Sequence, residues 1–334
     1  MTDIAVLGAG SWGTALAMHA ARIGHAVRLW SIEPDVVDEI RVRRSNAVYL
    51  PDITLPAGID ATLRLAEAVA GAGIVVAAVP SHALRGVLAD VRPWLEPGAV
   101  LVSVVKGLET GTLLRMSQVI AEEIAASHPI VVLSGPSFAI EVARELPTAV
   151  SVASGDPQAA ERVQQEFRGK FFRIYTTPDV AGVEIGGAIK NVIAIAAGVV
   201  DGLGLGHNAR AALITRGLAE ISRLAIAEGG RRETLAGLSG LGDLVLTCMG
   251  EYSRNRHVGV ELAKGRGLME ILAGMKMVAE GVKTTEAALA LGARRGVELP
   301  IAAQMSELLA GRTQPGAAVA ELMLRPQRIE VETG

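Results

Sequence analysis

Two of the six lysines in the chain stand among apolar residues, where a charged side chain is unusual. Lys106 follows the apolar run 100–105, and Lys190 lies within the small and apolar segment 186–194. Removal from water lowers the pKa of an ammonium group, which lets it give or take a proton near neutral pH. Arginine cannot do this, because its guanidinium stays charged. The two positions predict general acid–base chemistry, foremost at Lys190, unless the head groups simply reach solvent.

A glycine-rich turn follows the first apolar run of the chain, residues 4–7. Gly8, Gly10 and Gly13 fit the pattern G-x-G-x-x-G at the start of a helical stretch. In dinucleotide-binding proteins the first glycine permits the tight turn, the second lets the backbone approach a pyrophosphate, and the third lets the helix pack closely. The helix N-terminus also favours an anion. This context predicts a dinucleotide site; the alternative is an ordinary turn between strand and helix.

The residues after the second predicted strand bear on which dinucleotide is bound. An acidic residue there holds the ribose hydroxyls of NAD, whereas an arginine accommodates the 2′-phosphate of NADP. The sequence has Ser31-Ile32-Glu33 after Trp30, with no arginine directly after the strand. Glu33 therefore either binds the ribose or only begins the next helix beside Pro34, where acidic residues are favoured. The sequence leaves both possibilities open.

A polar cluster in the second half of the chain is suited to binding a phosphate group. Arg254 can donate two parallel hydrogen bonds to phosphate, with Ser253 and Asn255 as neutral partners. The alternative is a surface helix cap. Asp243 either orients Lys190 or caps the helix that follows it, and both roles are compatible.

Three further observations concern anion, metal and thiol chemistry. Gly135 and Ser137 follow the apolar run 130–133 and either present backbone N–H groups to an anion or form a plain turn. No pair of histidines shows metal-ligand spacing with carboxylates, so we expect no metal. Cys248 is the single cysteine, which excludes an internal disulfide and predicts a small buried side chain.

The hydrophobic pattern predicts two domains that position these residues. Short apolar runs alternate with helical stretches in the first half, at 4–7, 26–30, 74–79, 100–105 and 130–133, with a helix at 14–23 and a last strand at 171–175. Long helical segments follow, among them 209–228, 268–273 and 284–293. We therefore predict an α/β fold: a Rossmann-like, mostly parallel sheet domain over residues 1–180 that binds the dinucleotide. An all-α C-terminal domain over residues 181–330 would bind substrate and carry the catalytic lysine.

Composition limits the class of protein. The 334 residues are half hydrophobic and carry a formal net charge of −3, which argues against a basic nucleic-acid-binding face. The N-terminus has no basic region ahead of an apolar stretch, so we expect no signal peptide. The longest apolar runs, such as 192–200, are about half the length of a membrane span. Together with the single cysteine, these features predict a cytoplasmic protein without nucleic-acid or membrane partners.

Several segments resemble the bacterial NAD(P)-dependent glycerol-3-phosphate dehydrogenase family, in the expected order over nearly the whole chain. Segment 187–208 is similar to the family signature, and further matches lie at 8–15, 133–139, 240–244, 253–256 and 278–282. The resemblance implies reversible reduction of dihydroxyacetone phosphate to sn-glycerol 3-phosphate with NAD or NADP, feeding glycerophospholipid synthesis. It also implies a homodimer.

The resemblance implies roles for individual residues. Lys190 corresponds to the proton donor and acceptor of the family. Substrate contacts are implied for Lys106, Gly135, Ser137, Lys190, Asp243, Ser253, Arg254 and Asn255. Cofactor contacts are implied for Ser11, Trp12, Tyr49, Lys106, Ala139, Arg254, Val278 and Glu280, which join Gly8, Gly10, Gly13 and Glu33. The family often has His or Arg at the places of Ile32 and Glu33, so this sequence departs from its relatives there.

Two other functions remain as alternatives. A related enzyme could use the same layout to reduce another small keto acid or β-hydroxy acid, but the cluster at Arg254 favours a phosphorylated substrate. A non-catalytic nucleotide sensor would have no need of a proton donor, so Lys190 argues against it.

Overall fold

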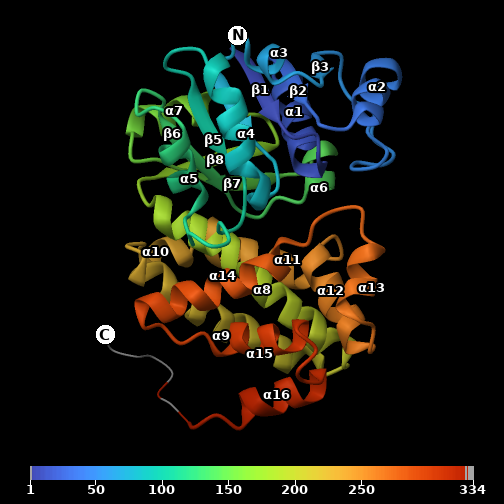
Figure 1. Cartoon of the computed structure of the whole chain (residues 1–334), viewed down its shortest axis with the longest axis vertical. Coiled ribbons are helices and arrows are strands. Elements are labelled where there is room, and N and C mark those ends of the chain that lie inside the picture. Colours follow the sequence, from blue (N-terminus) through green and yellow to red (C-terminus); the bar gives the residue numbers. More distant parts are fainter. Residues whose placement is uncertain (1, 328, 330–334) are drawn as a thin grey trace.

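The computed structural model describes residues 2–327 and residue 329, and it contains a sheet part followed by a helical part (Figure 1). In the described chain the sheet has eight strands in the order β3-β2-β1-β4-β5-β6-β7-β8. All neighbouring strands are parallel except β6 and β7. The strands are β1 Asp3–Leu7, β2 Ala26–Trp30, β3 Ile59–Thr62, β4 Ile74–Ala77, β5 Val100–Ser103, β6 Ile130–Ser134, β7 Thr148–Ala153 and β8 Phe172–Thr177. The predicted fold class is confirmed.

Helices cover both faces of the sheet, because successive strand residues point to opposite sides. Ile4 and Val6 of β1 pack into one core with α1 Ser11–Arg22, α2 Pro34–Arg43, α6 Ala139–Ala143 and α7 Pro157–Glu166. Ala5 and Leu7 pack into the opposite core with α3 Leu65–Val69, α4 Leu84–Val91 and α5 Met116–Glu123. Burial on both faces explains why the sequences of these strands are continuous apolar runs.

The sheet differs from the prediction in two ways. Strands β3 and β7 were not predicted, since β3 carries the exposed Asp60 and β7 mixes small and polar residues among its apolar ones. Strands β4 and β5 end two residues before the apolar runs 74–79 and 100–105 do. Val79 and Val105 are buried all the same, so an apolar run marks burial and does not by itself mark strand pairing.

Helix α8, Val180–Gly202, forms the centre of the helical part, and every residue from Gly182 to Val200 is buried. Around it lie α9 Gly206–Ala227, α10 Arg232–Leu235, α11 Asp243–Met249, α12 Arg254–Ala263, α13 Leu268–Ala273, α14 Glu280–Arg295, α15 Pro300–Leu309 and α16 Pro315–Met323. The predicted segments 209–228, 268–273 and 284–293 fall on α9, α13 and α14.

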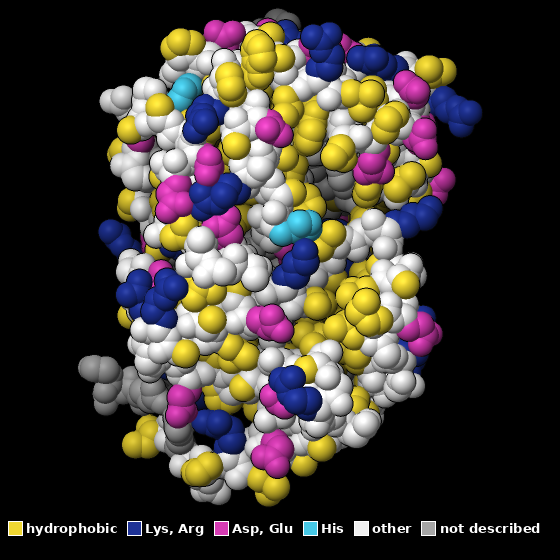
Figure 2. All heavy atoms as spheres, in the orientation of Figure 1, with side chains coloured by type: hydrophobic (Ala, Val, Ile, Leu, Met, Phe, Trp, Pro, Cys, Tyr) yellow, Lys and Arg dark blue, Asp and Glu magenta, His cyan; other side chains and the backbone are white. Residues whose placement is uncertain are grey.

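Helix α8 is also the one helix in the described part of the chain that is long and apolar enough to cross a membrane. Its apolar stretch is entirely buried within the protein, as in the core helix of a globular domain. The expectation drawn from the run 192–200 underestimated the helix, because Lys190 and Asn191 interrupt the apolar run without interrupting the helix. On the face shown in Figure 2, acidic and basic side chains are interspersed.

Helices α8 and α12 are in contact through their backbones. A Cβ atom on Gly198 would overlap the carbonyl oxygen of Arg256, and a Cβ atom on Gly259 would overlap that of Ile195. The two helices can approach this closely only because neither glycine has a side chain. The contact fixes the N-terminus of α12, which begins at Arg254, relative to Lys190 on α8.

We expect Gly259→Ala to lower the free energy of unfolding by about 3 kcal/mol, because the added methyl group forces two backbones apart. Urea denaturation followed by circular dichroism measures this change. Gly316→Ala in α16 is the matched control, since nothing lies within 4 Å of the added Cβ atom. Equal stability of the two variants would show that the close contact is not required.

Candidate functional site

A cavity of about 710 Å³ lies between the sheet part and the helical part. Its walls include the glycine-rich turn after β1, the residues that follow β2, β4 and β5, and residues of α8, α11 and α12. Ligands of open parallel sheets bind outside the carboxyl ends of the strands, at the point where the strand order reverses. In this sheet the reversal lies between β1 and β4. The position and volume of the cavity suit a nucleotide and a small substrate.

The glycine-rich turn has the shape that a dinucleotide requires. Gly8 has φ +117°, and a Cβ atom there would lie 2.7 Å from the carbonyl oxygen of Ala78. A Cβ atom on Gly13 would overlap the carbonyl oxygen of Gly8. Nothing lies within 4 Å of the Cβ position of Gly10, which lines the cavity. The turn therefore leaves open space at Gly10, beside the N-terminus of α1, where an anionic pyrophosphate is stabilised.

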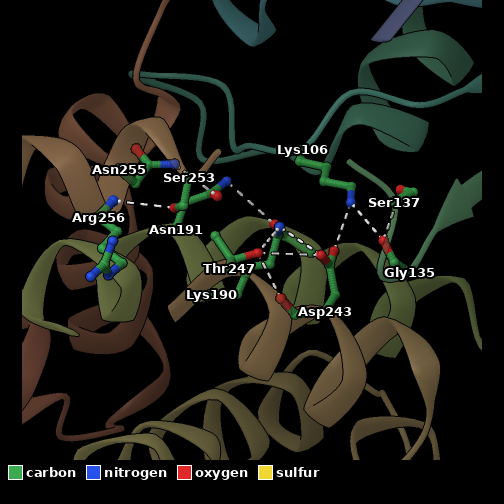
Figure 3. A network of polar contacts seen from close by, with 11 residues as sticks. Lys106, Gly135, Ser137, Lys190, Asn191, Asp243, Thr247, Ser253, Asn255 and Arg256 are labelled. Carbon is green, nitrogen blue, oxygen red and sulfur yellow. Dashed lines mark hydrogen bonds and ion pairs between the residues drawn. The ribbon is translucent and has the colours of Figure 1, made fainter. Parts of the chain in front are cut away.

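Two lysines share one buried carboxylate on the helical side of the cavity (Figure 3). Lys190 Nζ donates a hydrogen bond to Asp243 Oδ1 at 2.7 Å, and Lys106 Nζ donates one to Asp243 Oδ2 at 2.6 Å. Lys106 also donates to the carbonyl oxygen of Gly135 at 3.1 Å. Lys190 is 6% exposed and Asp243 is 1% exposed. Residues 137 positions apart in the sequence thus form one charged cluster.

Burial lowers the pKa of Lys190 to about 8, and the positive charge of Lys106 acts in the same direction. The Asp243 carboxylate opposes both effects and raises the pKa. Desolvation is the larger influence on the pKa. The charged ammonium loses more stabilisation when it leaves water than the Asp243 carboxylate provides. Lys190 can therefore exchange a proton close to neutral pH.

Thr247 holds Lys190 from a second side and was not singled out from the sequence. Its Oγ1 accepts a hydrogen bond from Lys190 Nζ at 2.6 Å and donates one to the carbonyl oxygen of Asp243 at 2.6 Å. Asp243 and Thr247 are four residues apart on α11, so they lie on one face of the helix. This spacing is the signal that could have identified Thr247.

The N-terminus of α12 lies on the cavity wall. Ser253 caps the helix by accepting a hydrogen bond from the Arg256 amide at 3.2 Å, so the helix cap that was the alternative to a phosphate site is present, although Ser253 is buried. The exposed guanidinium of Arg254 makes no hydrogen bond or ion pair with any residue that the structure describes. Asn255 instead binds inside the protein, donating to Asn191 Oδ1 at 2.9 Å and accepting from the Gly281 amide at 2.9 Å.

At the opposite end of the cavity, Tyr49 links the residues after β2 to the glycine-rich turn. Its hydroxyl donates to Glu33 Oε1 at 2.6 Å, and its carbonyl oxygen accepts from Ser11 Oγ at 2.6 Å. Ser11 also contacts Met277 Sδ at 2.9 Å. Glu280 accepts hydrogen bonds from the backbone amide and the hydroxyl of Ser81, at 3.1 and 2.6 Å. The contacts of Met277 and Glu280 join the sheet part to the start of α14 and the residues just before it.

Most residues singled out from the sequence line this one cavity: Gly8, Gly10, Ser11, Trp12, Glu33, Tyr49, Lys106, Ser137, Ala139, Lys190, Asp243, Ser253, Arg254, Asn255, Val278 and Glu280. Gly13 and Gly135 do not line it. Gly13 packs behind the turn against Gly8, and Gly135 contributes its carbonyl oxygen to Lys106. The wall also contains Asn191, Thr247, Phe138, Tyr252, Lys276 and Met277, to which no site role was assigned from the sequence.

The described residues include no group of three or more His, Cys, Asp or Glu side chains placed to hold a metal ion. Cys248 is fully buried, as predicted, and burial raises the pKa of its thiol to about 12.

Known proteins share both halves of this arrangement. The family model for the N-terminus of NAD-dependent glycerol-3-phosphate dehydrogenase matches residues 3–160, and the model for its C-terminus matches residues 179–320. A glycerol-3-phosphate dehydrogenase [NAD(P)+] from Moorella thermoacetica is 51% identical over 332 residues, 99% of this chain and 98% of the relative. One from Koribacter versatilis is 55% identical over 276 residues, 82% of each chain.

Solved structures agree with the sequence matches. The crystal structure of glycerol-3-phosphate dehydrogenase from Coxiella burnetii has a TM-score of 0.93 and 43% identity, covering 97% of this chain and 99% of that one. A ketopantoate reductase from Ralstonia eutropha, at 16% identity and a TM-score of 0.60, shares the fold alone. The dinucleotide turn, the paired lysines and the matches over both halves lead to one conclusion: the chain belongs to the NAD-dependent glycerol-3-phosphate dehydrogenase family.

Proposed function

We propose that this chain interconverts dihydroxyacetone phosphate and sn-glycerol 3-phosphate with NAD(H) or NADP(H). The observation that carries the proposal is the cluster of Lys190, Asp243 and Lys106, which shares a cavity with the dinucleotide turn and with Arg254. The names of the relatives support the same reaction.

The bound nicotinamide supplies or accepts the hydride. Lys190 donates a proton from Nζ to the carbonyl oxygen of the ketone as negative charge develops there, and it removes the proton in the reverse direction. Lys106 places a second positive charge nearby, which stabilises the developing alkoxide. Asp243 holds both ammonium groups in position, and Thr247 fixes the direction of the Lys190 head group.

The phosphate group of the substrate lies at the N-terminus of α12 in this proposal. Arg254 makes no hydrogen bond or ion pair with the described residues and can donate two parallel hydrogen bonds to phosphate oxygens. Ser253 and Asn255 line the same wall, and the hydrogen bonds of Asn255 to α8 and α14 keep Arg254 at a fixed distance from Lys190. Gly135 and Ser137 act from the sheet side, where Gly135 orients Lys106.

We extend the proposal to the domain division, the oligomeric state, the metabolic role and the cellular location. The domain division at 1–180 and 181–330 is supported by the end of β8 at Thr177 and the start of α8 at Val180. The family resemblance supports a homodimer and a supply of glycerol 3-phosphate for glycerophospholipid synthesis. The single, buried cysteine is compatible with the reducing cytoplasm.

Lys190→Ala should lower kcat by roughly two to four powers of ten, as loss of a general acid does. The dissociation constant for NADH should stay nearly unchanged, because Lys190 acts on the substrate. Steady-state kinetics and a binding titration measure the two quantities. Lys283→Ala, at an exposed lysine of α14 outside the cavity, is the matched control. A Lys190→Ala variant with the kcat of the control would remove Lys190 from this role.

The two directions should depend on pH in opposite ways, since the pKa of Lys190 is about 8. Ketone reduction needs the protonated ammonium, so its kcat/KM should be constant at lower pH and fall as pH rises through this value. Oxidation of glycerol 3-phosphate needs the neutral amine, so its kcat/KM should rise over the same range. Rate profiles in both directions measure this, and parallel profiles would contradict the assignment.

The function itself is tested by following NADH and NADPH oxidation with dihydroxyacetone phosphate, with unphosphorylated dihydroxyacetone and with keto acids. We expect dihydroxyacetone phosphate to be reduced far more efficiently than dihydroxyacetone, which should give only weak activity. Arg254→Ala should raise KM for dihydroxyacetone phosphate about 10- to 100-fold, the loss expected for charge-assisted hydrogen bonds. Its weak activity on dihydroxyacetone should hardly change. Turnover of a keto acid alone would overturn the proposed function, and equal losses on both ketones would overturn the role of Arg254.

A further inference from the structure

The residues after β2 form the cavity wall beside the glycine-rich turn. The amide of Gly8 donates to the carbonyl oxygen of Trp30 at 3.0 Å, which joins the turn to the end of β2. Ser31, Ile32 and Glu33 follow, and all three line the cavity. In this arrangement the end of β2 meets the ribose that carries the adenine of a bound dinucleotide. A residue here can distinguish a free 2′-hydroxyl from a 2′-phosphate.

Glu33 is held in place by a side chain from outside its own helix. It occupies the position before the first residue of α2, yet its carboxylate accepts no hydrogen bond from that helix. Glu33 Oε1 accepts from the Tyr49 hydroxyl at 2.6 Å. Glu33 Oε2 has no hydrogen bond or ion pair with the residues that the structure describes. One carboxylate oxygen is therefore fixed and the other is free to accept from a ligand.

Tyr49 is itself anchored to the glycine-rich turn. Ser11 donates to its carbonyl oxygen at 2.6 Å, and Asn46 Nδ2 donates to the Ala9 carbonyl and to Thr14 Oγ1, each at 2.9 Å. Burial and the hydrogen bond to Glu33 raise the pKa of Tyr49 to about 12. The hydroxyl therefore remains a donor throughout the working pH range, and the carboxylate keeps one position relative to the turn.

The residues that follow β2 offer no positive charge to a 2′-phosphate. None of Ser31, Ile32 and Glu33 is basic, and Ile32 is 78% exposed without any charged group. Four basic side chains line the cavity from other segments: Lys106 and Lys190, which are paired with Asp243, and Arg254 and Lys276. A 2′-phosphate would therefore face a fixed carboxylate, and like charges placed together strongly oppose binding.

We propose that Glu33, positioned by Tyr49, makes this enzyme select NAD(H) over NADP(H). The free carboxylate oxygen accepts hydrogen bonds from the ribose hydroxyls of NAD(H), and the same negative charge rejects the phosphate of NADP(H). This inference rests on the proposed function and narrows it from either nucleotide to one.

The test is direct binding of NADH and NADPH without substrate, followed by quenching of tryptophan fluorescence, since Trp12 and Trp30 line the cavity. The unchanged protein should bind NADH about 100-fold more tightly than NADPH, as expected for a like-charge contact. Glu33→Gln keeps the size of the side chain and one acceptor. This variant should bind NADPH about 10-fold more tightly or better, and its dissociation constant for NADH should change only a few-fold.

Two further variants test whether the preference for NADH depends on the charge at Glu33 itself and on the Tyr49 hydroxyl. Asp38→Asn makes the same charge change on an exposed residue of α2 outside the cavity, and it should leave the ratio of the two dissociation constants unchanged. Tyr49→Phe removes only the hydroxyl, and it should weaken NADH binding several-fold and reduce the ratio. Thermal unfolding of each variant establishes that it is folded.

The outcomes are distinguishable. Equal binding of NADH and NADPH by the unchanged protein, or an unchanged ratio in Glu33→Gln, would overturn the inference. If both nucleotides bind equally and dihydroxyacetone phosphate is still reduced, the proposed function stands and only the selection by Glu33 is wrong. If neither nucleotide binds, the proposed function itself fails.

Discussion

The site depends on one carboxylate that neutralises two ammonium groups in a water-poor cavity. Asp243 accepts from Lys190 with one oxygen and from Lys106 with the other, and it is almost completely buried. A buried charge is tolerated only when opposite charges and hydrogen bonds surround it. With both lysines charged, the cluster carries one positive charge in excess. The excess favours an anionic substrate and explains why one of the lysines gives up its proton readily.

The cluster also joins the two parts of the molecule. Lys106 follows β5 in the sheet part, while Lys190 and Asp243 belong to the helical part. Glu280 contacts Ser81 across the same boundary, and Met277 contacts Ser11 at the glycine-rich turn. Lys190 is therefore held at a set place relative to the dinucleotide site. Neither part contains the complete site, because the glycine-rich turn and the lysine–carboxylate pair come from different parts.

The sequence predicted those features that depend on neighbours in the chain. The glycine-rich turn, the buried strands and the unusual position of Lys190 follow from local pattern. The cavity is lined by most of the residues that the family resemblance singled out, Gly135 excepted. Strands β3 and β7 escaped prediction, because their residues are short or mixed in polarity and pairing with the sheet decides their structure. Three hydrogen bonds depend on contacts between distant segments: Lys106 to Asp243, Lys190 to Thr247 and Tyr49 to Glu33. Periodicity does not show which distant segments meet, and only the spacing of Asp243 and Thr247 on one helix points to Thr247.

The glycines of α8 have a consequence for how this sequence can change over evolutionary time. Gly186, Gly187, Gly198 and Gly202 each face a different neighbour, and an added Cβ atom would come closer to each than any normal contact allows. Substitution at one of these places must be matched by a change in another segment before selection accepts it. We therefore expect fewer accepted substitutions along this helix than on exposed helices such as α16. The close packing of α8 thus restricts substitution along the helix that carries Lys190, independently of the role of that lysine.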